Sequence, residues 1–83
     1  MKYEVYEVYD SITEDSYVLE TFNDLEAAKN AARALAEEAL SQYGEESYLA
    51  NRYDDDAHVE WAIHTLYRGN WETRTPYYGV KEA

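Results

Sequence analysis

The sequence predicts an α+β fold, an antiparallel sheet of about four strands with one helix packed on one face. Three observations support this prediction: an alanine-rich segment with helical spacing at residues 23–43, β-rich segments before it in residues 2–22, and an alternating segment after it at residues 58–67. The order strand, strand, helix, strand, strand is typical of a two-layer domain. A chain of 83 residues forms one domain, residues 1–83, with one modest core.

Residues 2–9 and 16–22 are rich in β-forming residues and flank a polar segment at residues 10–15, which predicts a hairpin. The first strand does not alternate cleanly, because tyrosine and valine occur at both odd and even positions. A β-bulge, or a strand buried on both sides, would explain this pattern.

Residues 23–43 predict one amphipathic helix. Asn23 can cap the first turn and form a capping box with Glu26, while Asp24 adds negative charge at the positive end of the helix dipole. Gly44 supplies the stop. The apolar stripe consists of Leu25, Ala28, Ala32, Leu35, Ala36, Ala39, Leu40 and Tyr43.

Residues 44–56 read as an acidic loop, with room for a short strand or a turn of helix at residues 47–53. Residues 58–67 then alternate as a strand, with valine, tryptophan, isoleucine, threonine and tyrosine on one face. A helix beginning behind an Asp56 cap also fits the spacing. The β-branched and aromatic content favours the strand.

A second hairpin is predicted around a three-residue loop, Arg68-Gly69-Asn70, because this register keeps the apolar side chains on one face. A two-residue Gly69-Asn70 turn would mix polar and apolar partners. Pro76 cannot donate a ladder hydrogen bond, so the last strand should lie at an edge or break there. The cross-strand pairs predicted by the longer loop are Tyr67–Trp71, Thr65–Thr73 and Trp61–Tyr77.

The composition indicates a protein-binding surface. Eighteen acidic residues against seven basic ones give a net charge of −11, which repels nucleic acid and anionic membranes and attracts basic proteins. Ten tyrosines supply side chains suited both to a sheet and to a binding surface. The sequence has no cysteine and no apolar segment of membrane-spanning length, so we expect a cytoplasmic protein without disulfides.

The acidic residues are unevenly distributed: residues 1–22 contain six against one lysine, and residues 44–56 contain five against one arginine. If the helix runs back toward the first turn, these segments meet at one acidic pole. A solvated surface without a partner is the alternative. The candidate protein-binding residues are Asp10, Glu14, Asp15, Glu45, Glu46, Asp54, Asp55 and Asp56 as electrostatic contacts, with Tyr48 and Tyr53 as aromatic anchors.

Catalytic and metal chemistry find little support in the sequence. Asp54, Asp56 and His58 alternate as oxygen and nitrogen ligands would, but the glycine and the distal glutamate of a calcium loop are missing. His58 and His64 would lie about 20 Å apart on an extended strand, too far to share a metal. No segment predicts a serine nucleophile with its base. We therefore expect a protein without enzyme activity, cofactor or metal.

Two segments resemble the small acidic anti-CRISPR proteins of phages that act on type I surveillance complexes, type I-E among them. These are the helix Leu25-Glu-Ala-Ala-Lys-Asn-Ala-Ala-Arg-Ala-Leu and the tail His64-Thr-Leu-Tyr-Arg-Gly-Asn-Trp-Glu-Thr-Arg-Thr. The resemblance implies inhibition by DNA mimicry in the host cytoplasm, with an acidic surface filling a basic channel that otherwise holds target DNA. The alternative is an acidic cytoplasmic housekeeping or interaction domain, for instance from a high-salt organism.

Overall fold

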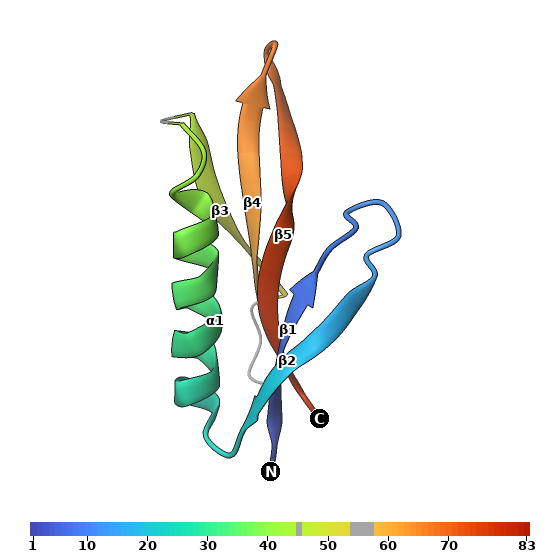
Figure 1. Ribbon diagram of the computed structural model, residues 1–83, viewed down its shortest axis with the longest axis vertical. Coiled ribbons are helices and arrows are strands. Elements are labelled where there is room, and N and C mark those ends of the chain that lie inside the picture. Colours follow the sequence, from blue (N-terminus) through green and yellow to red (C-terminus); the bar gives the residue numbers. More distant parts are fainter. Residues whose placement is uncertain (45, 54–57) are drawn as a thin grey trace.

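The α+β class and the antiparallel sheet are confirmed, but the sheet has five strands rather than about four (Figure 1). The computed structural model describes residues 1–44, 46–53 and 58–83. The strands lie in the order β2-β1-β5-β4-β3, and every neighbouring pair is antiparallel. The elements are β1 (Tyr3–Val8), β2 (Ser16–Phe22), α1 (Leu25–Leu40), β3 (Ser47–Arg52), β4 (His58–Tyr67) and β5 (Asn70–Glu82).

The additional strand is β3, which lies inside the predicted acidic loop and confirms the short strand, one of the two alternatives for residues 47–53. Its residues pair with β4 from Ser47 opposite Thr65 to Arg52 opposite Glu60. The sequence SYLANR shows little alternation, so its strand character depends on the neighbour with which it pairs. In the sequence, β3 follows α1 and precedes β4, and in the sheet it forms an edge strand next to β4.

Helix α1 is shorter than predicted at both ends. Asp24, not Asn23, is the N-cap, and its carboxylate accepts a hydrogen bond from the Ala27 backbone N–H at 3.3 Å. The helix ends at Leu40, and Tyr43 belongs to the following turn, where its N–H donates to the Leu40 carbonyl at 3.0 Å. This tighter turn satisfies a carbonyl that the helix end would leave without a partner.

Buried side chains form two clusters. The first joins the alanines of α1 to strand residues, and Figure 1 shows α1 running beside β4 and β5. Strand β1 contributes to both clusters, which confirms a strand buried on both sides and explains its irregular pattern. We name the two sides of the sheet the Val5 side and the Tyr6 side. The first cluster consists of Val5, Ala28, Ala32, Ala36, Ala39, Val59, Ile63, Tyr78 and Val80, and the second of Tyr6, Val8, Ala62 and Tyr77.

A β-bulge interrupts the pairing of β1 with the edge strand β2. Val5 pairs with Glu20 and Tyr6 pairs with Val18, so Leu19 is an extra residue in β2. The bulge predicted for this hairpin is therefore present, although it lies in the second strand. Bulges of this kind bend a strand and increase its twist.

Pro76 lies in the central strand β5, so its predicted place at a sheet edge is wrong, whereas the predicted break is found. Trp61 of β4 pairs with Tyr78, and Ile63 pairs with Arg74. Three residues of β5, with Pro76 in the middle, thus lie opposite one residue of β4. This irregularity accommodates the missing N–H of proline within an interior strand.

The β4–β5 hairpin closes with a two-residue turn, Arg68-Gly69, so the predicted three-residue loop is wrong. The φ angles of Arg68 and Gly69 are 50° and 81°, as a primed hairpin turn requires. The predicted pair Trp61–Tyr77 is also replaced, because Trp61 pairs with Tyr78. The observed pairs near the turn are Tyr67–Asn70, Leu66–Trp71, Thr65–Glu72 and His64–Thr73.

Substitution of Gly79 by alanine should destabilise the fold. A Cβ at position 79 would lie 2.5 Å from Cζ of Tyr6 and 2.8 Å from the Val59 carbonyl oxygen. We expect Gly79→Ala to lower the free energy of unfolding by about 1–3 kcal/mol, because overpacking forces neighbouring groups apart. Urea denaturation measures the change. Gly44→Ala is the control, since nothing lies within 4 Å of its Cβ, and an equal loss in both variants would contradict the packing argument.

Candidate functional site

The structure places the predicted binding residues in two regions. Glu45 and Asp54–Asp56 lie outside the described residues. Asp10, Asp15, Glu46 and Tyr48 lie around the β1–β2 turn and the start of β3. Glu14 and Tyr53 instead meet at a cluster on the Tyr6 side of the sheet.

The β1–β2 turn holds its acidic residues in fixed positions. The Asp10 carboxylate accepts hydrogen bonds from the backbone N–H groups of Ile12 and Thr13 at 2.9 and 3.3 Å. The Thr13 hydroxyl donates to the Asp15 carboxylate at 2.9 Å. The two backbone hydrogen bonds lower the pKa of Asp10, so its carboxylate stays negatively charged at a lower pH than an ordinary aspartate does.

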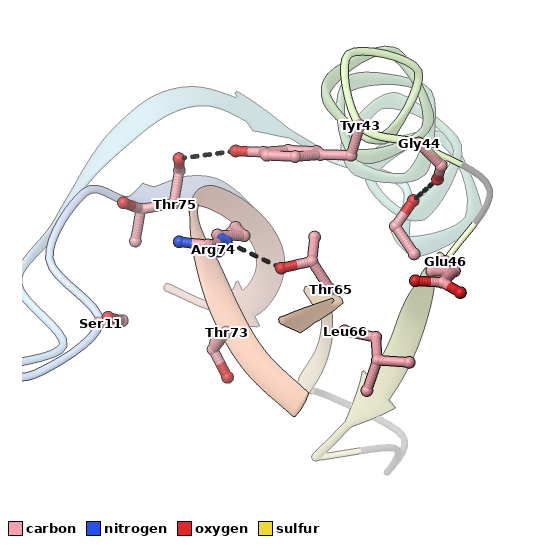
Figure 2. Close-up of a pocket in the computed structure, with 10 residues that line it drawn as sticks. Ser11, Tyr43, Gly44, Glu46, Thr65, Leu66, Thr73, Arg74 and Thr75 are labelled. Atoms are coloured by element: carbon pink, nitrogen blue, oxygen red, sulfur yellow. Dashed lines mark hydrogen bonds between the residues drawn. The ribbon is translucent and has the colours of Figure 1, made fainter. Parts of the chain in front are cut away.

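A hollow of about 700 Å³ lies between the β1–β2 turn, the end of α1 and the β4–β5 hairpin (Figure 2). Ser11, next to Asp10, lines it from one side, and Glu46 lines it from the other. Arg74 crosses its floor, donating to the Thr65 hydroxyl at 2.8 Å and pairing with a carboxylate of its own strand. The β1–β2 turn and Glu46 therefore lie on two sides of the same hollow.

Glu14 is paired with Arg52, whose Nη2 atom lies 3.1 Å from Oε1 of Glu14 and 3.5 Å from the Tyr53 hydroxyl oxygen. Glu14 precedes β2 and Arg52 ends β3, which are the two edge strands. Their contact requires the sheet to curl toward its Tyr6 side. Glu14 and Tyr53 both have positive φ, 58° and 51°, a conformation that costs about 1 kcal/mol or more and clusters at functional sites.

A hydrogen-bonded chain lies beneath this ion pair. The Tyr6 hydroxyl donates to Oε2 of Glu60 at 2.7 Å and lies 2.8 Å from Nε2 of His58. Because Tyr6 has one hydroxyl proton, its oxygen accepts from an Nε2–H of His58. The His58 ring also stacks on the ring of Tyr53, with centroids 4.8 Å apart.

Glu60 is a buried carboxylate with only 4% of its surface exposed. Its Oε1 atom lies 3.5 Å from Nε of Arg52, an ion-pair distance, but accepts no hydrogen bond among the described residues. A buried charge is tolerated when an opposite charge and hydrogen-bond donors accompany it. Tyr6 and Arg52 provide these partners, which makes the cluster a rigid part of the fold.

The Tyr6 hydroxyl is not suited to proton transfer at neutral pH. Burial, followed by the hydrogen bond to Glu60, raises the pKa of Tyr6 well above its usual value, so its hydroxyl stays protonated at neutral pH. A general base or nucleophile needs a pKa nearer the working pH. Within residues 1–44, 46–53 and 58–83, no three histidine or carboxylate side chains are placed to hold a metal ion.

The sequence reading missed the roles of Tyr6, Arg52 and Glu60. Glu60 was assigned to the solvated face of its strand, on which alternation places it with His58 and His64. Glu60 is buried because β3 pairs with β4 and places Arg52 over its carboxylate. A lone acid between Val59 and Trp61 is the one signal in the sequence, and it does not identify a partner.

Comparison of the chain with protein-family models, curated proteins and solved structures gives no match. No helix in the described part of the chain has the length and apolar character needed to cross a membrane. The function must therefore be argued from the chemistry of the described residues.

Tyr6→Phe should destabilise the protein by about 1–3 kcal/mol, because it leaves Oε2 of the buried Glu60 without its donor. Tyr67→Phe, at an exposed position of the hairpin, is the matched control and should change the free energy of unfolding by less than about 0.5 kcal/mol. Chemical denaturation gives both values. Equal stability of the Tyr6→Phe variant and the wild type would show that the hydrogen bond contributes nothing net.

Alkaline pH should weaken the fold. Burial and a hydrogen bond to Glu7 raise the pKa of Tyr78 from 10.0 to about 12, and the pKa of Tyr6 is also raised. A raised pKa means that the stabilisation is complete below pH 10 and is lost as the pH rises through the folded-state values. We expect the unfolding midpoint to fall between pH 10 and 12. Tyr78→Phe should flatten this decline, and an unchanged pH profile in that variant would contradict the assignment.

Proposed function

We propose that this chain is a non-enzymatic inhibitor that binds a basic nucleic-acid-binding protein through its acidic surface, without cofactor or metal. The carrying observation is the ordered β1–β2 turn, in which hydrogen bonds fix Asp10 and Asp15 at the surface. A net charge of −11 steers such a partner and repels nucleic acid itself. The resemblance to phage anti-CRISPR proteins suggests a type I CRISPR surveillance complex in the host cytoplasm as the partner.

In this proposal, α1 covers one face of the sheet and leaves the acidic end of the molecule free for the partner. The buried alanines of α1, which share a cluster with Val5, Val59 and Val80, support the packing. The hollow in Figure 2 supports this proposal, because Ser11 of the acidic β1–β2 turn and Glu46 line it from two sides. A lysine- and arginine-lined DNA channel is complementary to a surface of this charge.

The binding surface is tested by removing charge without disturbing the turn. The triple variant D10N/D15N/E46Q keeps side-chain acceptors that can hold the turn, leaves the Glu14–Arg52 ion pair intact and removes three negative charges. We expect its affinity for the surveillance complex to fall on the order of tenfold at low salt, and the deficit to shrink as salt screens the remaining charges. Competition against a labelled target-DNA duplex measures the affinity.

The control E20Q/E26Q/E82Q removes the same charge from exposed sites on β2, α1 and β5. An equal loss in both triple variants would show that net charge, and not the turn, decides binding. No binding by the wild type at low salt would overturn the proposed partner. Unfolding measured from low to molar salt addresses the halophile alternative, because a halophilic protein unfolds at low salt and an inhibitor from an ordinary cytoplasm stays folded.

A further inference from the structure

Strand β3 and the neighbouring β4–β5 hairpin together carry a patch of exposed aromatic side chains. Tyr48 and Trp71 are 45% and 52% exposed. Their rings meet edge to face with centroids 5.0 Å apart, and the Tyr48 ring lies 5.4 Å from that of His64. We name as the hairpin patch Tyr48, His64, Leu66, Trp71 and Thr73.

The strand register places these side chains on one side of the sheet. Tyr48 pairs with His64, which pairs in turn with Thr73, and Leu66 pairs with Trp71. Paired residues share a face, as do alternate residues of one strand, so the hairpin patch continues the Tyr6 side. The hairpin extends beyond the C-terminal end of α1 (Figure 1), which leaves its patch accessible.

The hairpin patch adjoins the acidic surface. Leu66 and Thr73 line the same hollow as Ser11 and Glu46 (Figure 2). The Leu66 backbone N–H also donates to the Glu46 carbonyl at 2.9 Å. A partner that contacts Glu46 would therefore meet Tyr48, two residues further along the chain on the edge strand β3, and the ring of Trp71 that Tyr48 contacts.

We propose that the hairpin patch binds arginine side chains of the basic partner, with guanidinium groups stacked on Trp71 and Tyr48. This inference rests on the proposed function and names the chemistry of one contact within it. Arginine combines a planar face that stacks on aromatic rings with hydrogen bonds to carboxylates, whereas lysine offers only a point charge. On the other side of the hairpin, the Arg68 guanidinium lies 5.3 Å from the Tyr67 ring centroid, so an arginine of the chain itself already occupies that ring.

The aromatic rings alone would also suit stacked nucleic-acid bases. The net charge of −11 opposes that occupant, because strand binding requires a positively charged groove to track the phosphates. Glu46, two residues before Tyr48, places a carboxylate beside the hairpin patch, which favours a cation. The protein partner is thus the occupant that both the rings and the charges support.

The test uses two labelled peptides of equal length and charge, one alternating arginine with glycine and the other lysine with glycine, followed by fluorescence anisotropy. The arginine peptide should bind more tightly than the lysine peptide. Trp71→Ala and Tyr48→Ala should each weaken arginine-peptide binding on the order of tenfold. Tyr67→Ala, an equally exposed aromatic on the other side of the same hairpin, is the control and should bind as the wild type does.

The outcomes separate this inference from the proposed function. If both peptides bind equally and the Trp71 and Tyr48 variants match the wild type while D10N/D15N/E46Q binds weakly, the inference fails and the acidic surface stands. If neither peptide binds at low salt, both fail. Trp71-dependent binding of a single-stranded DNA oligonucleotide in preference to the arginine peptide would overturn the inference, because the rings would then be a base-stacking site. Unfolding midpoints near the wild-type value confirm that the variants are folded.

Discussion

Burial of the Glu60 carboxylate is the constraint on which the arrangement of the sheet depends. A charge removed from water must find partners, and those of Glu60 come from different strands: Tyr6 from β1 and Arg52 from β3. Strand β5 lies between β1 and β4, and only a residue without a side chain at Gly79 lets the Tyr6 ring reach across it. The strand order β1-β5-β4-β3 thus gives this carboxylate a hydrogen-bond donor on one side and an opposite charge on the other.

The elements that the sequence predicted well are those whose structure depends on local chemistry. The helix follows from alanine periodicity and a capping acid, and β4 from its alternation. For residues 47–53 the sequence allows either a short strand or a turn of helix, because SYLANR gains its strand structure from pairing with β4. The predicted register of the β4–β5 hairpin is wrong for a related reason. Keeping the apolar side chains on one face favours a three-residue loop, but Arg68 and Gly69 adopt positive φ and form a two-residue turn.

In the candidate site, too, the sequence indicates some residues and not others. Exposed acids are visible in a sequence, so the turn residues Asp10 and Asp15 could be proposed from composition and topology. The pairing of Glu14 with Arg52 could not be predicted from the sequence, because only the curl of the sheet brings these two residues together. The hairpin patch also depends on register, since a shift of one residue would move Trp71 to the opposite side of its strand.

The bulge at Leu19 bears on how this chain behaves at high concentration. Strand β2 is an unpaired edge, and it exposes Tyr17, Val18 and Leu19, residues that readily add to another sheet. The extra residue interrupts the regular spacing of backbone donors and acceptors that an incoming strand would have to match. The edge thereby resists strand-by-strand polymerisation, and the chain can remain dispersed at high concentration.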